Sequence, residues 1–272
     1  MFLRKLRISI AKVIIPVLYK IVLLLKANTR AINFFNEKRK NANNAYNFQK
    51  SIEELLGDKK LIGLDVGAQG GFNSDEFFPK KYNKYFNSIL VEPLMNALKD
   101  EQQKNIIKKG LWSSKGARKI YILNKRPQSS SMYEPDKKAL SIYDFKEKDF
   151  HLFDVGNTEM VECDRLDSCL KDLNIDNLDY LKIDTQGAEF EILKGLGGYK
   201  PLMIKCEVQV FPMYKKEPGW TEVTDTLYKL GYMISDWKEI GSHSTKTPVE
   251  MDMVFIPNFL LDSGKELILK NL

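Results

Sequence analysis

The chain has 272 residues, of which 43% are hydrophobic and 29% charged, and its net charge is +6. This composition is ordinary for a globular protein and excludes collagen-like and disordered chains. The length predicts one catalytic domain with a smaller appendage. Because the excess of positive charge is modest and no five Lys or Arg residues stand together, we expect no nucleic-acid partner.

The cysteines are odd in number and lack a CxxC spacing, which predicts neither a disulfide framework nor a zinc site. They are Cys163, Cys169 and Cys206. Only two histidines occur, His151 and His243, so the chain has no room for a multi-histidine metal site. Cysteine usage of this kind favours a reducing compartment, and we expect a cytoplasmic protein.

Residues 1–35 combine a basic face with an apolar face. Drawn as a helix at about 100° per residue, the segment places Lys5, Lys12, Lys20 and Lys26 on one side and most of its isoleucines and leucines on the other. Lys12 and Lys20 interrupt the run of ~20 nearly uncharged residues that a membrane span needs. The pattern favours an amphipathic helix in the membrane interface, so that the protein is peripheral to the membrane. A helix packed on the protein or on a dimer mate, a signal peptide and a single-span anchor remain alternatives.

Residues 36–50 are polar and rich in asparagine, which indicates a linker or a solvated helix. From 51 to 272 apolar runs alternate with helical patterns, which predicts an α/β domain with a mostly parallel sheet. Strands are expected at 61–66, 88–93, 105–112, 118–123, 158–163, 178–184 and 202–210, helices at 187–196 and 220–231, and a closing antiparallel pair at 232–237 and 249–257. A helix is also expected between the first two strands, and the polar segment 124–138 is expected to be a long loop.

The segment LIGLDVGAQGG, residues 61–71, joins the first strand to a glycine-rich turn. In open parallel sheets, ligands bind beyond the carboxyl ends of the strands. Gly67 and Gly70 allow close backbone approach, and free N–H groups at the start of a following helix would favour a carboxylate or a phosphate. The turn is neither the dinucleotide fingerprint, because Gln69 stands where its second glycine belongs, nor a P-loop. A purely structural turn is the alternative.

The next acidic residue at a strand end is Glu92, 25 residues after Gly67. A carboxylate at this place can accept two hydrogen bonds from a ribose diol, although a solvated rim residue is the alternative. Together, the turn and the acid favour a nucleoside ligand with a carboxylate tail. S-adenosylmethionine has both parts.

Several segments resemble, in the same order, the FkbM family of S-adenosylmethionine-dependent methyltransferases. They are LDVGAQGGF, ILVEP, GLWSSKGARKIYIL, QSSSM, LDYLKIDTQGAEFEILKG and MIKCEVQVFPMY. The resemblance covers about residues 60–240. Its most specific block, LKIDTQGAEFEILKG, is similar to the family pattern Lys-Ile-Asp-x-Glu-Gly-x-Glu, with Gln186 where a glutamate is commonest.

The resemblance implies a class I, Rossmann-like methyltransferase fold, with a mostly parallel seven-stranded sheet and an antiparallel last strand. It also implies S-adenosylmethionine as the cofactor. The implied contacts are the methionine end near Asp65, Gly67 and Gly70, the ribose at Glu92, and the adenine between Leu111 and Trp112. A core position is the alternative for Trp112.

Methyl transfer from a sulfonium is an in-line displacement, so the protein mainly supplies alignment and a polar, water-poor site. Asp184, at the end of its strand, is expected to act as a base or to orient the acceptor, with helix capping as the alternative. Glu207 lies in an apolar run where an unpaired carboxylate is costly, which predicts a partner. With Asp184 it could orient a sugar hydroxyl or bind a divalent cation.

His243, in a late loop, is a further candidate base, whereas His151 is expected at the surface. The serines at 129–131 could reach the cofactor or the substrate, or could be ordinary polar loop residues. FkbM-like enzymes commonly O-methylate sugars or polyketide-type hydroxyls. The resemblance and residues 1–35 together predict an O-methyltransferase acting on a sugar hydroxyl of a cell-surface or lipid-linked glycan. N- or carboxyl-methylation of a small molecule and a cofactor-binding module without turnover are the alternatives.

Overall fold

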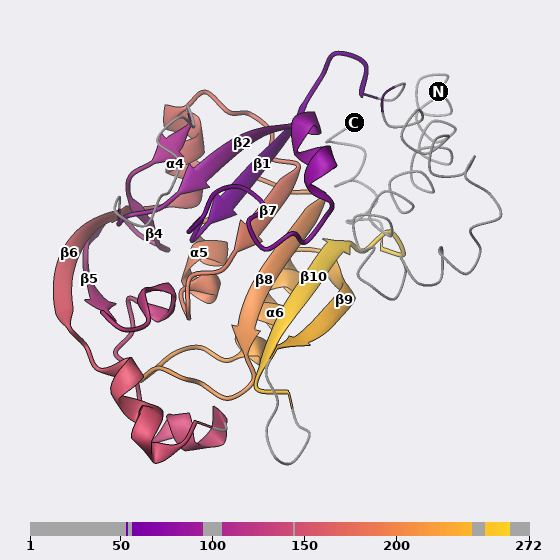
Figure 1. Ribbon diagram of the computed structural model, residues 1–272. Helices are drawn as coiled ribbons and strands as arrows, with labels where there is room; N and C mark the ends of the chain where they lie inside the picture. The colour runs from indigo at the N-terminus through magenta and orange to yellow at the C-terminus, as the bar shows by residue number, and fades with distance from the viewer. Residues whose placement is uncertain (1–52, 54–55, 95–104, 144, 241–247, 262–272) are drawn as a thin grey trace. The chain divides into compact units, whose positions relative to one another are not determined.

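The computed structural model describes residues 53, 56–94, 105–143, 145–240 and 248–261 (Figure 1). The predicted segments 1–35 and 36–50 lie outside these residues. The chain divides into two compact units, a larger one of Gly63–Phe72 with Ser88–Leu272 and a smaller one of Met1–Ile62 with Asn73–Asn87. Within the described ranges, no helix is long and apolar enough to cross a membrane.

A seven-stranded sheet runs in the order β3-β2-β1-β7-β8-β10-β9 (Figure 1). Its strands are β1 (Leu61–Val66), β2 (Phe86–Val91), β3 (Ile106–Ile107), β7 (Tyr180–Ile183), β8 (Met203–Gln209), β9 (Tyr232–Ile240) and β10 (Glu250–Pro257). The pairs β2–β3, β1–β7 and β7–β8 are parallel. β10, the last strand of the chain, is antiparallel to both β8 and β9. The predicted α/β class and seven-stranded sheet are therefore confirmed.

The two faces of the central strands differ in chemistry because side chains alternate along each strand. One face carries the buried apolar residues Val66, Ile183, Cys206 and Met253, which are neighbours in register. The other face is polar and carries Asp65, Lys182, Lys205, Glu207, Gln209, Glu250 and Asp252. We call these seven residues the polar face.

The described residues of the larger unit include three short α-helices, α4 (Leu166–Asp172), α5 (Glu189–Lys194) and α6 (Trp220–Lys229). In α6, Val223 and Leu227 are buried and lie one helical turn apart, so they form a single apolar face. α5 contacts α6 and β8, and α6 also contacts β8 and β9. These contacts hold the chain that follows β7 against the neighbouring strand.

A second sheet has three strands in the order β4-β6-β5, namely β4 (Gly110–Leu111), β6 (Asn157–Asp164) and β5 (Gly116–Ile122). The predicted strand at 105–112 is therefore wrong, because it divides between the two sheets. Lys109, at the division, lies with its Nζ 3.2 Å from Asp164 Oδ2 at the end of β6. A Cβ at Gly110 would lie 2.7 Å from Cys163 Sγ in β6, so glycine allows the close approach to β6.

The predicted loop at 124–138 is partly ordered by backbone pairing. It contains the 3-10 helix η3 (Pro127–Ser129), and Ser131 and Pro135 form β-bridges with Tyr121 and Tyr214. Two further 3-10 helices follow, η4 (Ala139–Tyr143) and η5 (Glu147–Phe153). Their buried side chains share one cluster, made by Leu123, Leu140, Tyr143, Phe153, Met213, Tyr214 and Val249. This apolar packing, which a polar sequence pattern does not reveal, holds the segment against the chain after β8.

The α-helix predicted between β1 and β2 does not form, although residues 67–85 are all described. Five residues in this stretch have positive φ: Gly67 (76°), Gly70 (92°), Gly71 (95°), Asn73 (55°) and Glu76 (51°). A right-handed helix requires negative φ, so it cannot start here. The stretch forms turns and then the 3-10 helix η1 (Lys80–Tyr85).

In the smaller unit, the side chain of Asn73 is hydrogen-bonded to the backbone five residues further along the chain. Asn73 Nδ2 donates to the Phe78 carbonyl at 2.7 Å, and Asn73 Oδ1 accepts from the Phe78 N–H at 3.3 Å. Phe78 is fully buried and stacks on Phe86, with ring centroids 5.3 Å apart. The asparagine thus closes the chain on itself where helical bonds are missing.

Candidate active site

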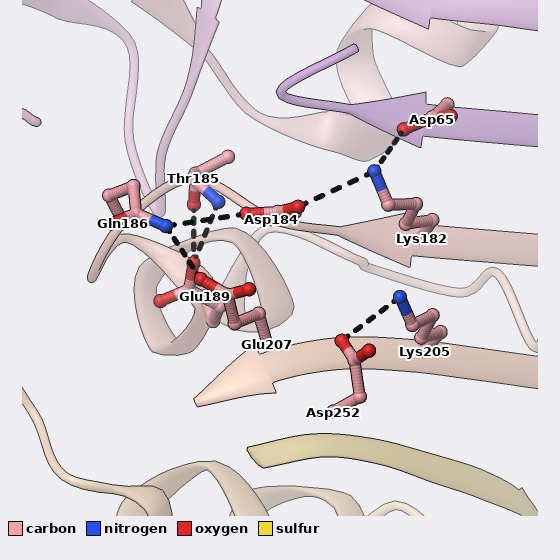
Figure 2. A network of polar contacts seen from close by, with 9 residues as sticks. All are labelled: Asp65, Lys182, Asp184, Thr185, Gln186, Glu189, Lys205, Glu207 and Asp252. Carbon is pink, nitrogen blue, oxygen red and sulfur yellow. Dashed lines mark hydrogen bonds and ion pairs between the residues drawn. The ribbon is translucent and has the colours of Figure 1, made fainter. Parts of the chain in front are cut away.

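Two buried ion pairs neutralise the middle of the polar face. Lys182 Nζ lies 3.2 Å from Asp65 Oδ1, and the two side chains are 3% and 0% exposed. On the neighbouring strands, Lys205 Nζ lies 2.9 Å from Asp252 Oδ1. Since an uncompensated buried charge costs several kcal/mol, roughly 3–5, each lysine and its carboxylate depend on each other. The polar face is therefore charged but locally balanced (Figure 2).

Beyond these pairs, at the carboxyl ends of β7 and β8, three side chains meet (Figure 2). Gln186 Nε2 donates to Glu207 Oε1 at 2.6 Å and to Asp184 Oδ1 at 3.5 Å. We call Asp184, Gln186 and Glu207 the amide bridge. The prediction that Glu207 has a partner is confirmed, and the partner is the amide of Gln186.

The two carboxylates of the amide bridge have different surroundings. Asp184 keeps 30% of its side chain exposed, and its Oδ2 lies 3.5 Å from the ammonium group of Lys182. Glu207 is more enclosed, so burial raises its pKa well above the ordinary value, and the negative charge of Asp184 adds to the rise. Asp184 is thus the accessible member of the pair, and Glu207 binds a proton more readily than an ordinary glutamate.

The backbone at Gln186 is unusual, because this residue has φ of 57° without being glycine. Two hydrogen bonds hold it from the serine-rich segment and from Tyr214. Its carbonyl accepts a hydrogen bond of 2.5 Å from the Ser131 hydroxyl, and its Oε1 accepts one of 3.0 Å from the Tyr214 hydroxyl. The Tyr214 hydroxyl also contacts the Ser129 carbonyl at 2.8 Å. A non-glycine residue with positive φ persists only when its surroundings hold it, which these contacts do.

Ser129 and Ser131 are therefore not ordinary polar loop residues, since both are buried, at 3% and 1% exposure. Ser131 Oγ also accepts from the Tyr133 N–H at 3.0 Å. The serine-rich segment thus supports the amide bridge from the side of the smaller sheet. This function was not predicted.

Glu189 closes the loop that carries the bridge. Its Oε1 accepts from the N–H and the hydroxyl of Thr185, both at 2.9 Å, and its Oε2 accepts from the N–H of Gly187 at 2.9 Å. Burial raises its pKa to about 7, although these hydrogen bonds act in the opposite direction. The residue that caps α5 is Ala188, so the alternative that Asp184 caps this helix is wrong.

The glycine turn after β1 lies directly against Asp184. The N–H of Gly67 donates to the Val91 carbonyl at 3.1 Å, and the N–H of Asp184 donates to the Val66 carbonyl at 3.0 Å. A Cβ at Gly67 would lie 1.8 Å from the Asp184 carbonyl oxygen. The close approach of the Asp184 backbone therefore explains why position 67 requires a glycine.

The free N–H groups predicted after the turn are mostly absent, because the turn bonds to itself. The N–H of Gln69 donates to the Gly67 carbonyl and that of Gly71 to the Ala68 carbonyl, both at 2.9 Å. Gly70 is exposed, and its N–H has no partner in the part of the chain that the structure describes. The N–H of Gly70 is thus available to a ligand at this edge of the sheet.

Glu92 follows β2, as predicted, and is 7% exposed. Its Oε1 accepts from the N–H of Leu94 at 2.9 Å. Burial raises the pKa of Glu92, and the Leu94 hydrogen bond offsets part of the rise. Leu94 in turn packs on the cluster of the smaller sheet that also contacts Trp112. Glu92 is therefore hydrogen-bonded to a residue, Leu94, that packs on the same cluster as Trp112.

Leu111 and Trp112 differ in exposure. Leu111 is 2% exposed, whereas Trp112 is only partly buried. The Arg118 guanidinium lies 4.8 Å from the centre of the Trp112 ring, and the Tyr133 ring lies 5.6 Å from it. Trp112 thus belongs to an aromatic and cationic surface, and Leu111 to the core.

Among the remaining candidates, His151 is exposed as predicted, and its Nδ1 contacts the Lys148 carbonyl at 2.6 Å. His243 lies outside the described residues. Across the described ranges, no three or more His, Cys, Asp or Glu side chains are grouped so that they could hold a metal ion.

Sequence reasoning missed Lys182, Lys205 and Tyr214. The two lysines had a detectable signal, because each interrupts an otherwise apolar strand, in YLKI and MIKCEV. A buried lysine requires a carboxylate, and the acids at 65 and 252 were available. Tyr214 had no such signal, since its contact with Gln186 joins segments 28 residues apart.

Comparison with protein families matches residues 65–234 to the Methyltransferase FkbM domain. Comparison with curated proteins gives no match. The matched span contains the glycine turn, Glu92 and the whole amide bridge.

Proposed function

Because the chain belongs to the FkbM methyltransferase family, we propose that it transfers the methyl group of S-adenosylmethionine to a hydroxyl group of a carbohydrate. The observation that carries this proposal is the amide bridge. It presents an accessible carboxylate, Asp184, at the end of a strand and directly beside the glycine turn. A hydroxyl acceptor needs a group that orients it and takes its proton, and Asp184 is placed to do so.

The residues at this edge fit the cofactor in one respect, namely the unpartnered N–H of exposed Gly70, which suits a carboxylate. When bound, S-adenosylmethionine supplies a methyl group on a positively charged sulfur. Glu92 would hold the ribose and Trp112 the adenine. Asp65 is fully buried against Lys182, so its part is to fix that lysine instead of contacting the cofactor.

In the proposed reaction Asp184 accepts the proton of the acceptor hydroxyl, while Lys182 holds the Asp184 carboxylate in place from 3.5 Å. Glu207, with its raised pKa, donates a hydrogen bond to the acceptor when it is protonated. Gln186 keeps the two carboxyl groups apart. A divalent cation between them is disfavoured because the Gln186 amide presents donor hydrogens there, and N–H donors do not ligate cations.

The test uses tritiated S-adenosylmethionine, the purified full-length protein and a glycolipid extract. We expect label in a glycan in alkali-stable form, since a methyl ether resists the base that cleaves a methyl ester. Alkali-labile label would instead establish carboxyl methylation, and label in an amine would establish N-methylation. Cofactor binding without any transfer would identify a binding module.

We further propose that the basic segment 1–35 holds the enzyme on the cytoplasmic membrane surface, where a lipid-linked glycan is presented. Each lysine near an anionic leaflet contributes about 1 kcal/mol. The full-length protein should sediment with phosphatidylglycerol vesicles and be released by high salt. Replacement of Lys5, Lys12, Lys20 and Lys26 by glutamine should abolish sedimentation, and equal sedimentation of this variant would remove the proposal.

A further inference from the structure

Two buried hydrogen-bond donors beyond the amide bridge have no partner among the residues that the structure describes. They are Arg126 Nε and Gln209 Nε2, and the Gln209 side chain is 2% exposed. A buried donor without a partner costs about 1–3 kcal/mol, and such groups are rare in native proteins. Two of them in one neighbourhood require an explanation.

Gln209 belongs to the same strand and the same face as Glu207. It lies two residues further along β8, so both side chains point to the polar face. Across the sheet, Gln209 is in register with Glu250, the first residue of β10. Side chains directly opposed on antiparallel strands have their Cβ atoms about 4.5–5.5 Å apart. Gln209 and Glu250 therefore continue the polar face outward from the amide bridge.

Arg126 approaches this pair from the segment after β5. Its guanidinium packs over the rings of Phe145 and Phe153, 5.1 and 4.9 Å from their centres. Phe153 belongs to the same buried cluster as Val249, the residue directly before Glu250, so Arg126 and Glu250 are neighbours. In agreement, the positive charge of Arg126 lowers the pKa of Glu250, which burial raises to about 7. In the described residues the guanidinium makes no hydrogen bond or ion pair with any side chain.

These three side chains form an unsatisfied set with complementary chemistry. Arg126 and Gln209 supply donors, and Glu250 supplies an acceptor that no described residue engages. A hydroxyl group can accept from a donor and donate to a carboxylate at the same time. An anionic group is disfavoured, because it would add negative charge to a region that already holds several acids. These acids are Asp184, Glu207, Glu217 and Glu250.

We propose that Arg126, Gln209 and Glu250 form a subsite that binds the hydroxyl groups of a neutral sugar and so presents the acceptor to the amide bridge. This inference rests on the proposed carbohydrate methyltransferase function. The aromatic rings of Phe145 and Phe153 pack against the Arg126 guanidinium and restrict its position. The two unpartnered donors are explained because the acceptor satisfies them.

The test is saturation-transfer NMR on the full-length protein with S-adenosylhomocysteine. The probes are the methyl glycosides of glucose, galactose and mannose and the corresponding methyl glycosiduronates. We expect at least one neutral glycoside to bind and the charged uronates to bind more weakly. Arg126→Met and Gln209→Leu should each weaken the neutral glycoside about tenfold, the loss of one good hydrogen bond. Lys125→Met, at the exposed neighbour of Arg126, is the matched control and should bind like the wild type.

Gln209→Leu has a second readout that separates binding from structure. Because leucine removes an unpaired buried donor, the melting temperature without sugar should stay equal or rise while sugar binding falls. If S-adenosylhomocysteine binding is intact, either of two results overturns the subsite. One is unchanged sugar binding in both variants, and the other is stronger binding of the uronates than of the neutral glycosides. Absence of any neutral glycoside signal in the wild type overturns it as well. Failure of the wild type to bind S-adenosylhomocysteine overturns the proposed function itself.

Discussion

The glycine turn after β1 and the amide bridge after β7 lie side by side, but they are built by different means. The turn is defined by backbone, since a Cβ at Gly67 would strike the Asp184 carbonyl and the N–H groups of Gln69 and Gly71 bond within the turn. The bridge is defined by side chains from distant segments, because Gln186 is held by Ser131 and Tyr214. Changes in the turn should therefore affect folding, and changes in the bridge should affect chemistry.

The largest effect is expected from Gly67→Val. The new Cβ would lie 1.8 Å from a backbone oxygen, and φ of 76° is strained for a β-branched residue. We expect a loss of about 4 kcal/mol or more, which would lower the melting temperature by roughly 10 °C. Gly198→Ala is the control, because nothing lies within 4 Å of its new Cβ. A Gly67→Val protein that melts like the wild type would show that the turn is not defined by its backbone.

Asp184→Asn, in contrast to Gly67→Val, should lower turnover and leave the fold unchanged. Turnover should fall by about 10² or more with near-normal S-adenosylmethionine affinity, as expected for a group that acts on the acceptor. Labelled methyl transfer and calorimetry measure the two quantities. Asp154→Asn, at an exposed acid far along the chain, is the control.

Glu207→Gln, alone and combined with Asp184→Asn, tests whether the bridge acts as a unit. A double variant no slower than the slower single variant is expected for one unit. If the fold-reduction in turnover of the double variant equals the product of the two single reductions, the carboxyl groups act independently, although they share the Gln186 amide.

The strands that carry the site were predictable because they are short apolar runs. Asp184 and Glu92 were marked as acids at strand ends, and Glu207 as an acid inside an apolar run. The bridging residue was not predictable as such. Gln186 was recognised only as a departure from a family pattern, and its role depends on Tyr214. Likewise, the Asp65–Lys182 pair joins residues 117 positions apart, which only the strand register brings together.

The missing helix after β1 has another cause. The stretch between the two strands is long enough for a helix, but the positive φ of Asn73 and Glu76 cannot be read from residue types that usually adopt negative φ. Local pattern thus predicts strands and strand-end acids well. It does not predict conformations that long-range packing imposes.

The pH dependence of stability should reveal the contribution of Glu217, which lies beside the loop that carries the amide bridge but is not part of the bridge. Glu217 Oε2 accepts from the N–H groups of Met213 and Tyr214, whereas its buried Oε1 has no partner and lies where a Cβ at Gly187 would be 2.9 Å away. Burial raises the pKa of Glu217 to about 8. The protonated form is therefore favoured by folding, and its stabilisation is fully present below pH 4.5 and is lost as the pH rises to about 8.

Glu217→Gln removes this titration and keeps an oxygen for both N–H groups. Within that window the wild type should lose up to ~1.4 kcal/mol per pH unit that the variant retains. Melting temperatures measured from pH 5 to pH 9 should diverge as the pH rises. Parallel curves would mean that Glu217 is not buried as the structure shows.

The smallest effect is expected from Glu92→Gln. This variant tests whether a side chain contributes to cofactor binding beside the glycine turn, which is defined by its backbone. Glutamine keeps an oxygen for the Leu94 N–H, so the fold should be intact, and the melting temperature should stay equal or rise because a buried charge is removed. Cofactor affinity should nevertheless fall about tenfold, since the charge-assisted bonds from a ribose diol to a carboxylate are stronger than those to a neutral amide.

Wild-type affinity should also weaken as the pH falls toward the raised pKa of Glu92, whereas the affinity of the variant should not change with pH. Calorimetry with S-adenosylhomocysteine measures both. If the variant binds as tightly as the wild type at every pH, Glu92 is a rim residue, and cofactor recognition at this edge depends on the backbone of the turn alone.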